Sequence, residues 1–157
     1  MEVIKSHYNP EDGVSVVVIR EGEDTAIGIV RLHPDDIDIA SSFAGCQFAE
    51  IKATIKIYKK KWQRIKRELD ILKQLYSDIE MLKHYNIEQE TQALSYFRKR
   101  IALLDEKADK AYIKYITLKQ EYPHIVDKRI QVTRDIMKKK LAENVNLSQE
   151  IDSNTNL

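Results

Sequence analysis

Three short stretches near the start of the chain are rich in apolar, β-branched residues, at about 2–8, 14–20 and 25–32. Residues that favour turns separate them, at 9–13 and 21–24. β-Branched side chains favour strands, and Gly, Pro, Asn and Asp favour the turns between strands. The pattern therefore predicts a three-stranded antiparallel sheet.

A heptad pattern follows the predicted sheet. From Phe48 to Ile79, apolar residues recur at alternating spacings of three and four, and the same spacing resumes from Leu94 to Tyr122. Such spacing places the apolar residues along one side of a helix, as in coiled coils. We predict two long helices, the first over about 41–83.

The two heptad patterns fit each other as an antiparallel hairpin. When Ile51 is paired with Tyr122, every successive layer along the two helices is apolar. In this register the small Ala111 lies opposite the large Trp62, which keeps the distance between the helices even. The register places the turn of the hairpin near 84–90.

The ends of the second helix have their own signals. Asn86 and Gln89 resemble a capping box, which starts a helix. Pro123 removes a backbone hydrogen bond, so we expect the helix to end or kink there. A further helical pattern predicts a third helix over 123–145, and the polar residues 146–157 predict a flexible tail.

The predicted fold class is thus α+β and mostly α. Residues 1–50 form a β-β-β-α module, its helix continues into a hairpin over 51–122, and a C-terminal helix follows. We call the line of apolar layers between the two helices the hairpin seam. Several apolar residues lie outside this seam and need cover, either from the third helix or from a second protomer. They are Ile57, Ile71, Leu75, Leu82, Leu103, Ile113 and Ile116.

Composition narrows the class of protein. With 43% apolar residues the 157-residue chain can bury a core, yet no apolar run approaches the roughly 20 residues of a membrane span. Cys46 is the single cysteine, which excludes an internal disulfide. We therefore expect a soluble cytoplasmic protein with no membrane contact.

Charge is distributed unevenly along the chain. Residues 1–50 carry ten acidic and three basic residues, a net charge of −7. The first long helix then carries a basic stretch, which predicts phosphate binding because clustered cations neutralise nucleic acid. The alternative is that these side chains only cover the core with their methylene groups. The candidate nucleic-acid-binding residues are Lys52, Lys56, Lys59, Lys60, Lys61, Arg64, Lys66, Arg67 and Lys73.

A pattern over residues 25–54 resembles that of a group of small bacterial and phage proteins with a double-stranded-RNA-binding-domain-like fold. The matching positions are Gly28, Pro34, Asp36, Gly45, Ala49 and Ala53. The resemblance implies a β-β-β-α module whose helix packs on the sheet. It does not imply RNA binding, because the lysine cluster that contacts phosphates in that fold is replaced here by three aspartates.

No catalytic, cofactor-binding or metal-binding motif stands out in the sequence, so we do not expect an enzyme. His33 lies close to Asp35 and Asp36, but a Pro-Asp turn leading into a helix explains this group better than a metal site does. Cys46 has no histidine placed by sequence to activate it, which favours a structural role.

These observations lead to three hypotheses. The first is a non-catalytic, homo-oligomeric interaction protein that binds a protein partner through Asp35, Asp36 and Asp38. Chain size, composition and the resemblance favour a phage accessory protein that blocks a host factor in defence or nucleic-acid processing. The alternative is a nucleic-acid-binding protein that uses the basic stretch, and the third hypothesis is a structural assembly protein.

Overall fold

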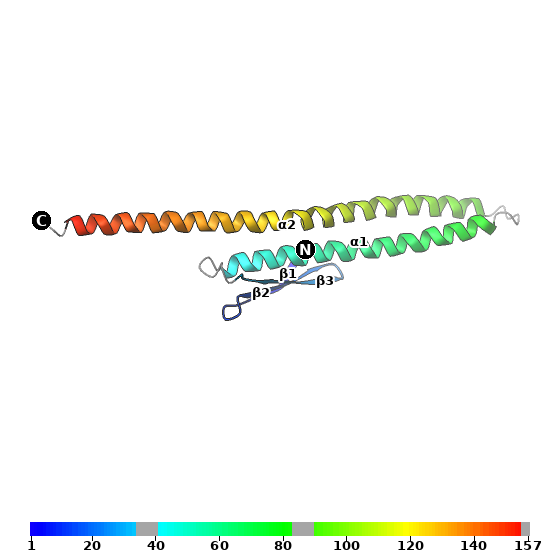
Figure 1. Cartoon of the computed structure of the whole chain (residues 1–157). Coiled ribbons are helices and arrows are strands. Elements are labelled where there is room, and N and C mark those ends of the chain that lie inside the picture. The colour runs from blue at the N-terminus through cyan, green and yellow to red at the C-terminus, as the bar shows by residue number, and fades with distance from the viewer. Residues whose placement is uncertain (34–40, 83–89, 155–157) are drawn as a thin grey trace.

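The computed structural model describes residues 1–33, 41–82 and 90–154. Three strands come first, followed by two long helices; the elements are β1 (Glu2–Asn9), β2 (Val14–Glu21), β3 (Asp24–Arg31), α1 (Ser42–Leu82) and α2 (Glu90–Asn154). The sheet lies against the first part of α1, and α2 runs alongside α1 in the opposite direction (Figure 1). The predicted α+β, mostly α fold is confirmed.

The sheet is an antiparallel meander with the order β1-β2-β3. Its two turns contain Gly13 and Gly22, both with a φ angle near +60°. This backbone conformation strains residues that carry a Cβ, so glycine is the natural choice in both turns. Side chains alternate along β2, where Ser15, Val17 and Ile19 are buried towards α1.

Small residues let α1 approach the sheet very closely. A Cβ at Gly28 would overlap the backbone carbonyl oxygen of Ala49, and a Cβ at Gly45 would overlap the hydroxyl of Ser15. The core between helix and sheet contains Val17, Ile19, Ala26, Ala49, Ala53 and Ile57. Helix and sheet therefore pack backbone to backbone at this point.

The hairpin has the predicted register. Arg98 Nε donates a 2.6 Å hydrogen bond to the Tyr76 hydroxyl, and Lys114 Nζ lies 5.7 Å from the centre of the Tyr58 ring. Each contact is within one residue of the predicted layer. Where the structure describes burial along α2, every buried side chain is a seam residue: Leu94, Leu104, Ala108, Ala111 and Tyr115. The predicted turn at 84–90, with Asn86 and Gln89, lies in a part of the chain that the structure does not describe.

One prediction about the C-terminal part is wrong. The chain does not form a separate helix over 123–145, because α2 continues through Pro123 as far as Asn154. The flexibility predicted for the tail stays a prediction. A proline inside a helix costs about 3 kcal/mol. Pro123 itself is exposed, and Tyr122 and Val126 near it are half-buried, so α2 keeps packed side chains on both sides of the proline.

The continuous helix leaves apolar side chains without the cover that a third helix would give. Ile57 is buried under the sheet, but Ile71, Leu75, Leu103 and Ile113 are 62%, 44%, 42% and 60% exposed. The last part of α2 projects beyond the first residue of α1 (Figure 1). We call this projecting part, residues 134–154, the overhang. Neither described helix is long and apolar enough to cross a membrane.

Candidate protein-binding surface

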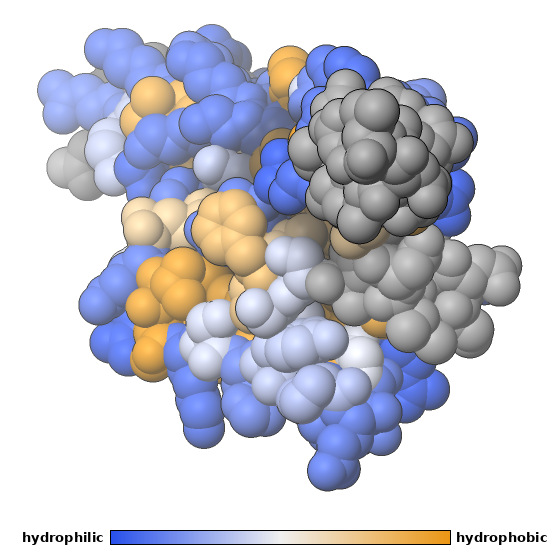
Figure 2. All heavy atoms as spheres, turned by 90° about the vertical axis from the view of Figure 1, so that its left-hand side faces the viewer, coloured by the Kyte–Doolittle hydropathy of each residue, from blue (hydrophilic) through white to orange (hydrophobic). Residues whose placement is uncertain are grey.

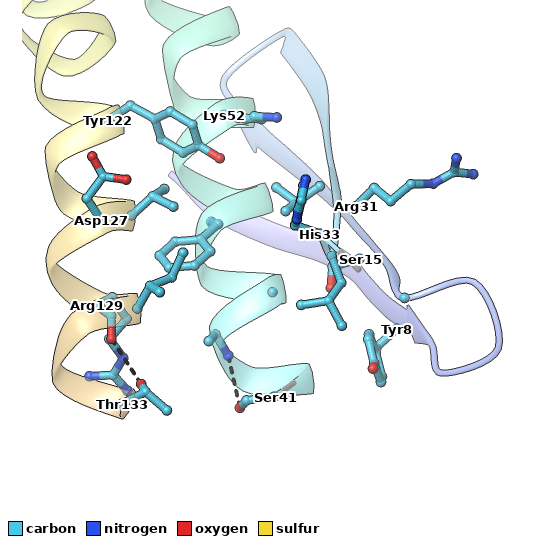
Figure 3. Close-up of a pocket in the computed structure, with 18 of the residues that line it drawn as sticks. Tyr8, Ser15, Arg31, His33, Ser41, Lys52, Tyr122, Asp127, Arg129 and Thr133 are labelled. Atoms are coloured by element: carbon cyan, nitrogen blue, oxygen red, sulfur yellow. Dashed lines mark hydrogen bonds between the residues drawn. The ribbon is translucent and has the colours of Figure 1, made fainter. Parts of the chain in front are cut away.

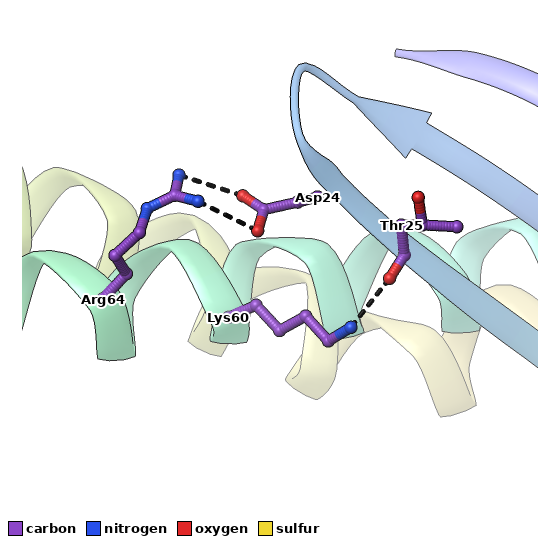
Figure 4. Close-up of polar contacts among 4 residues, drawn as sticks. All are labelled: Asp24, Thr25, Lys60 and Arg64. Atoms are coloured by element: carbon purple, nitrogen blue, oxygen red, sulfur yellow. Dashed lines mark hydrogen bonds and ion pairs between the residues drawn. The ribbon is translucent and has the colours of Figure 1, made fainter.

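The basic stretch of α1 faces the free edge of the sheet. Three of its lysines, four residues apart, donate hydrogen bonds from Nζ to backbone carbonyl oxygens of β3: Lys52 to Ile29 (3.3 Å), Lys56 to Ile27 (2.7 Å) and Lys60 to Thr25 (2.7 Å). Arg64, one turn further on, forms a two-pronged ion pair with Asp24, with both N–O distances at 3.0 Å. Figure 4 shows the last two of these contacts side by side.

Helix and strand repeats explain this series. Four residues of a helix rise about 6 Å, and two residues of a strand rise about 6.8 Å, so successive lysines meet successive outward carbonyls. The outward carbonyl groups of an edge strand otherwise form a template for pairing with other chains. The lysines therefore cap one edge of the sheet.

The other candidate nucleic-acid-binding residues are mostly engaged as well. Lys66 lies over the Trp62 ring at 5.5 Å, Lys73 forms a 3.0 Å ion pair with Asp105, and Arg67 donates to a backbone carbonyl of its own helix. Among the nine candidates, Lys59 and Lys61 are the two without such a contact to a described residue. The structure does not assemble the nine into one free cationic surface.

The other candidates from the sequence form no site. Asp35, Asp36 and Asp38 lie outside the described residues. Cys46 is half-buried and accepts a hydrogen bond of 3.2 Å from the Ser6 hydroxyl. In the described parts of the chain, no three His, Cys, Asp or Glu side chains come together as metal ligands would.

A cleft of about 520 Å³ lies between the start of α1, the sheet and α2. Tyr122 reaches across from α2 towards α1, while Arg31 points away to the other side of β3 (Figure 3). Lys52 turns towards β3, where its ammonium bonds the Ile29 carbonyl and lies 5.5 Å from the Tyr122 ring centre. Partial burial raises the pKa of Tyr122 above its ordinary value. The cleft is mainly apolar, and its lysine is already bonded within the chain.

The face of the sheet that points away from α1 is covered by no described element. β2 and β3 place aliphatic side chains on it, and two pairs of them meet across the strands: Val16 opposite Ile29, and Val18 opposite Ile27. Ile27 and Ile29 are 47% and 53% exposed. We call these four residues the outer sheet face.

Basic side chains surround the outer sheet face. Lys5 and His7 stand beside it on β1, and Arg20 and Arg31 are exposed at its ends. The ammonium group of Lys56 lies at its β3 edge. Figure 2 views the molecule from the end where α1 begins, and there apolar surface, in orange, lies among blue hydrophilic side chains.

Sequence reasoning missed this surface, although the sequence holds a signal for it. Val14 to Ile19 is apolar at nearly every position, so both faces of β2 carry apolar side chains. Such a run is typical of strands that are covered on both faces. Here α1 covers one face, and no described element covers the other.

The described residues form a β-β-β-α module whose helix continues into a long helical hairpin. No protein-family model, curated protein or solved structure matches the chain.

Proposed function

We propose that this chain is a non-catalytic interaction protein that binds another protein through the outer sheet face. The observation that carries the proposal is the group of four paired aliphatic side chains on a sheet face that no described element covers. Contiguous exposed apolar patches on soluble domains commonly mark interaction sites. Each isoleucine is about half exposed, so covering it completely would contribute on the order of 1 kcal/mol.

The charges around the patch indicate the chemistry of the partner. Lys5, Arg20 and Arg31 surround an apolar centre, so the complementary surface is apolar with an acidic rim. The sequence-based hypothesis of an acidic binding site depends on Asp35, Asp36 and Asp38, outside the described residues, and is a separate prediction. The acidic side chains of the described module lie mainly in its two turns rather than beside the patch.

The test compares two variants with the wild-type chain. Ile27→Thr with Ile29→Thr removes the apolar patch and keeps residues that favour strands. Ile113→Thr changes an equally exposed isoleucine on α2 and serves as the matched control. Proteins captured by the wild-type chain are identified, and their affinities for all three chains are then measured by calorimetry.

We expect the double variant to bind a captured partner at least about tenfold more weakly, because central apolar residues dominate most interfaces. The control should bind like the wild-type chain. Circular dichroism and thermal unfolding establish that both variants fold. Equal affinity of the folded double variant and the wild-type chain for every captured partner would refute the proposal.

A further inference from the structure

The strand β1 forms the second edge of the sheet, and this edge is open. Every residue from Glu2 to His7 is exposed, and β1 packs on α1 much less than β3 does. The three lysines of α1 that bond the sheet all reach carbonyl groups of β3, and none of them reaches β1. One edge of the sheet is therefore capped within the chain, while the other is left uncapped.

The contacts of β3 establish which backbone groups of β1 point outward. In an antiparallel sheet, the N–H and C=O of one residue point to the same side, and this side alternates along the strand. The carbonyl of Ile27 points outward from β3, so the opposite residue, Val18, bonds its other neighbour, Lys5. The next residue, Ser6, therefore points its N–H and C=O to the open edge, and so does Tyr8.

The open edge is regular over residues 5–9. The pairing of β1 with β2 is interrupted by a bulge between Val3 and Lys5, and the turn that begins at Pro10 ends the strand. Five strand residues span about 17 Å. The regular stretch is thus long enough to pair with a short segment of another strand.

Apolar surface lies beside the open edge on the side of α1. The Ser6 hydroxyl donates a 3.2 Å hydrogen bond to Cys46 Sγ, and Phe43, one turn before Cys46, is 63% exposed. Further along the same side of α1, Thr54 donates a hydrogen bond to the Sδ of Met1. Thr54 also lines a mainly apolar cleft of about 600 Å³ between α1 and α2. Side chains of an added strand that point towards α1 would therefore meet apolar groups.

The other side of the open edge is cationic at its centre. Residues 5–9 include Lys5 and no acidic residue. Glu2 lies beyond the bulge, opposite Arg20, and Asp12 accepts a hydrogen bond from Asn9 in the turn at the other end. A side chain placed directly opposite Lys5 is therefore favoured when it is acidic.

We infer that an extended segment of another protein adds antiparallel to β1 as a fourth strand. The recognising groups are the outward N–H and C=O groups of Ser6 and Tyr8, which an extended backbone matches. The side chains of this segment alternate between the two faces of the sheet. Those that face α1 are apolar, and those that face the other way are acidic because they lie beside Lys5.

A second copy of β1 is a poorer occupant than such a segment. Antiparallel pairing of two β1 strands through their outward groups places Ser6 opposite Ser6 or Tyr8, so hydroxyl groups meet in place of apolar side chains. The same two registers place Lys5 opposite His7 or Asn9, and neither residue carries a negative charge. The edge therefore favours a strand of different sequence.

The first experiment titrates the full chain into fluorescein-labelled peptides and follows their fluorescence anisotropy. The peptide Glu-Val-Glu-Val-Glu-Val-Glu should bind. Glu-Glu-Val-Val-Val-Glu-Glu has the same composition and charge, but it cannot place all its valines on one side of a strand. We therefore expect it to bind at least about tenfold more weakly.

Methylation of peptide nitrogens tests the backbone contact directly. In the alternating peptide, the valine N–H groups face β1 opposite Ser6 and Tyr8, so methylating the valine nitrogens should abolish binding. The N–H groups of the two central glutamates point away from β1, and methylating them should leave the affinity unchanged. Amide hydrogen exchange at Ser6 and Tyr8 should become slower when the unmodified peptide binds.

A proline at the open edge tests the strand within the full chain. Ser6→Pro removes an outward N–H and no hydrogen bond to β2, so the chain should fold and bind the peptide at least about tenfold more weakly. Thr25→Pro is the matched control, because Thr25 points its N–H outward at the capped edge. It should bind like the wild-type chain. If Ser6→Pro fails to fold, the methylated peptides still test the contact.

The charge preference has its own variant. Lys5→Glu should reverse it, so that Lys-Val-Lys-Val-Lys-Val-Lys binds this variant more tightly than the glutamate peptide does. Equal preference in the wild-type chain and the variant would contradict the acidic character of the partner strand.

The outer sheet face is tested separately from the open edge. Ile27 and Ile29 lie on β3, about 10 Å from β1, so the double variant Ile27→Thr with Ile29→Thr should bind the alternating peptide like the wild-type chain. A failure of the proposed partner binding would therefore leave the peptide result unchanged. Loss of peptide binding in this double variant would place the peptide on the outer sheet face and overturn the inference.

Other results would also overturn the inference. They are no binding of the alternating peptide up to about 1 mM, equal effects of methylation at valine and at glutamate, and full binding by folded Ser6→Pro. Sedimentation velocity of the chain alone provides a further check. Self-association that Ser6→Pro abolishes would make a second copy the occupant in place of another protein.

Discussion

Lys56 Nζ donates a 2.7 Å hydrogen bond to the carbonyl oxygen of Ile27, at the free edge of β3. Lys52 and Lys60 repeat this contact on either side. The backbone groups of an edge strand are thus bonded within the chain, and the lysines lose part of their availability for phosphate. This arrangement links the charge pattern of the helix to the stability of the sheet.

Replacing Lys52, Lys56 and Lys60 by methionine should weaken the module. Each lost hydrogen bond contributes about 0.5–1.5 kcal/mol, and these bonds are exposed, so we expect a total loss of about 1–3 kcal/mol in the free energy of unfolding. Urea denaturation measures this loss, and light scattering should show more aggregation because the edge is open. Lys59→Met with Lys61→Met is the control. An equal effect of both variants would show that charge alone matters.

Nucleic acid should bind weakly at physiological salt. Fluorescence anisotropy with labelled double-stranded RNA, double-stranded DNA and single-stranded DNA should show no submicromolar binding, and any binding at low salt should fall steeply as salt is added. The physical reason is that most of the candidate cations already have partners within the chain. Submicromolar binding that is lost when Lys59 and Lys61 are neutralised would restore the nucleic-acid hypothesis.

Gly28→Ala should destabilise the protein strongly. The added Cβ would overlap the carbonyl oxygen of Ala49, and relief requires a shift of the helix backbone, so we expect a loss of about 3 kcal/mol or more in urea denaturation. Gly22→Ala tests the left-handed backbone alone, since its φ is +61° and no atom lies within 4 Å. That variant should lose only about 1–2 kcal/mol. Similar losses in the two variants would contradict the close packing of helix and sheet.

The seam of the hairpin can be tested with two neighbouring leucines. Leu104 is 3% exposed and Leu103 is 42% exposed, so they differ mainly in burial. Leu104→Ala should reduce the free energy of unfolding by about 2–5 kcal/mol, and Leu103→Ala by well under 2 kcal/mol. Thermal unfolding followed by circular dichroism gives both values. A reversed order would mean that the register of the hairpin is wrong.

The sequence by itself determined the strands, the two long helices and the register between them. These features depend on local periodicity and on the matching of apolar layers, which can be read from one chain. The pairing of Ile51 with Tyr122 fixed the register closely enough to be checked by the observed contact between Arg98 and Tyr76.

Only the tertiary structure decided the role of the lysines, the path of the chain after Pro123 and the exposed surfaces. The spacing of Lys52, Lys56 and Lys60 is visible in the sequence, but their carbonyl partners lie at least 23 residues away in the chain. Pro123 is a local signal to end a helix, and the flanking helical turns override it. Whether a face of a strand or helix is covered depends on every other element, so the outer sheet face and the overhang emerge only from the assembled fold.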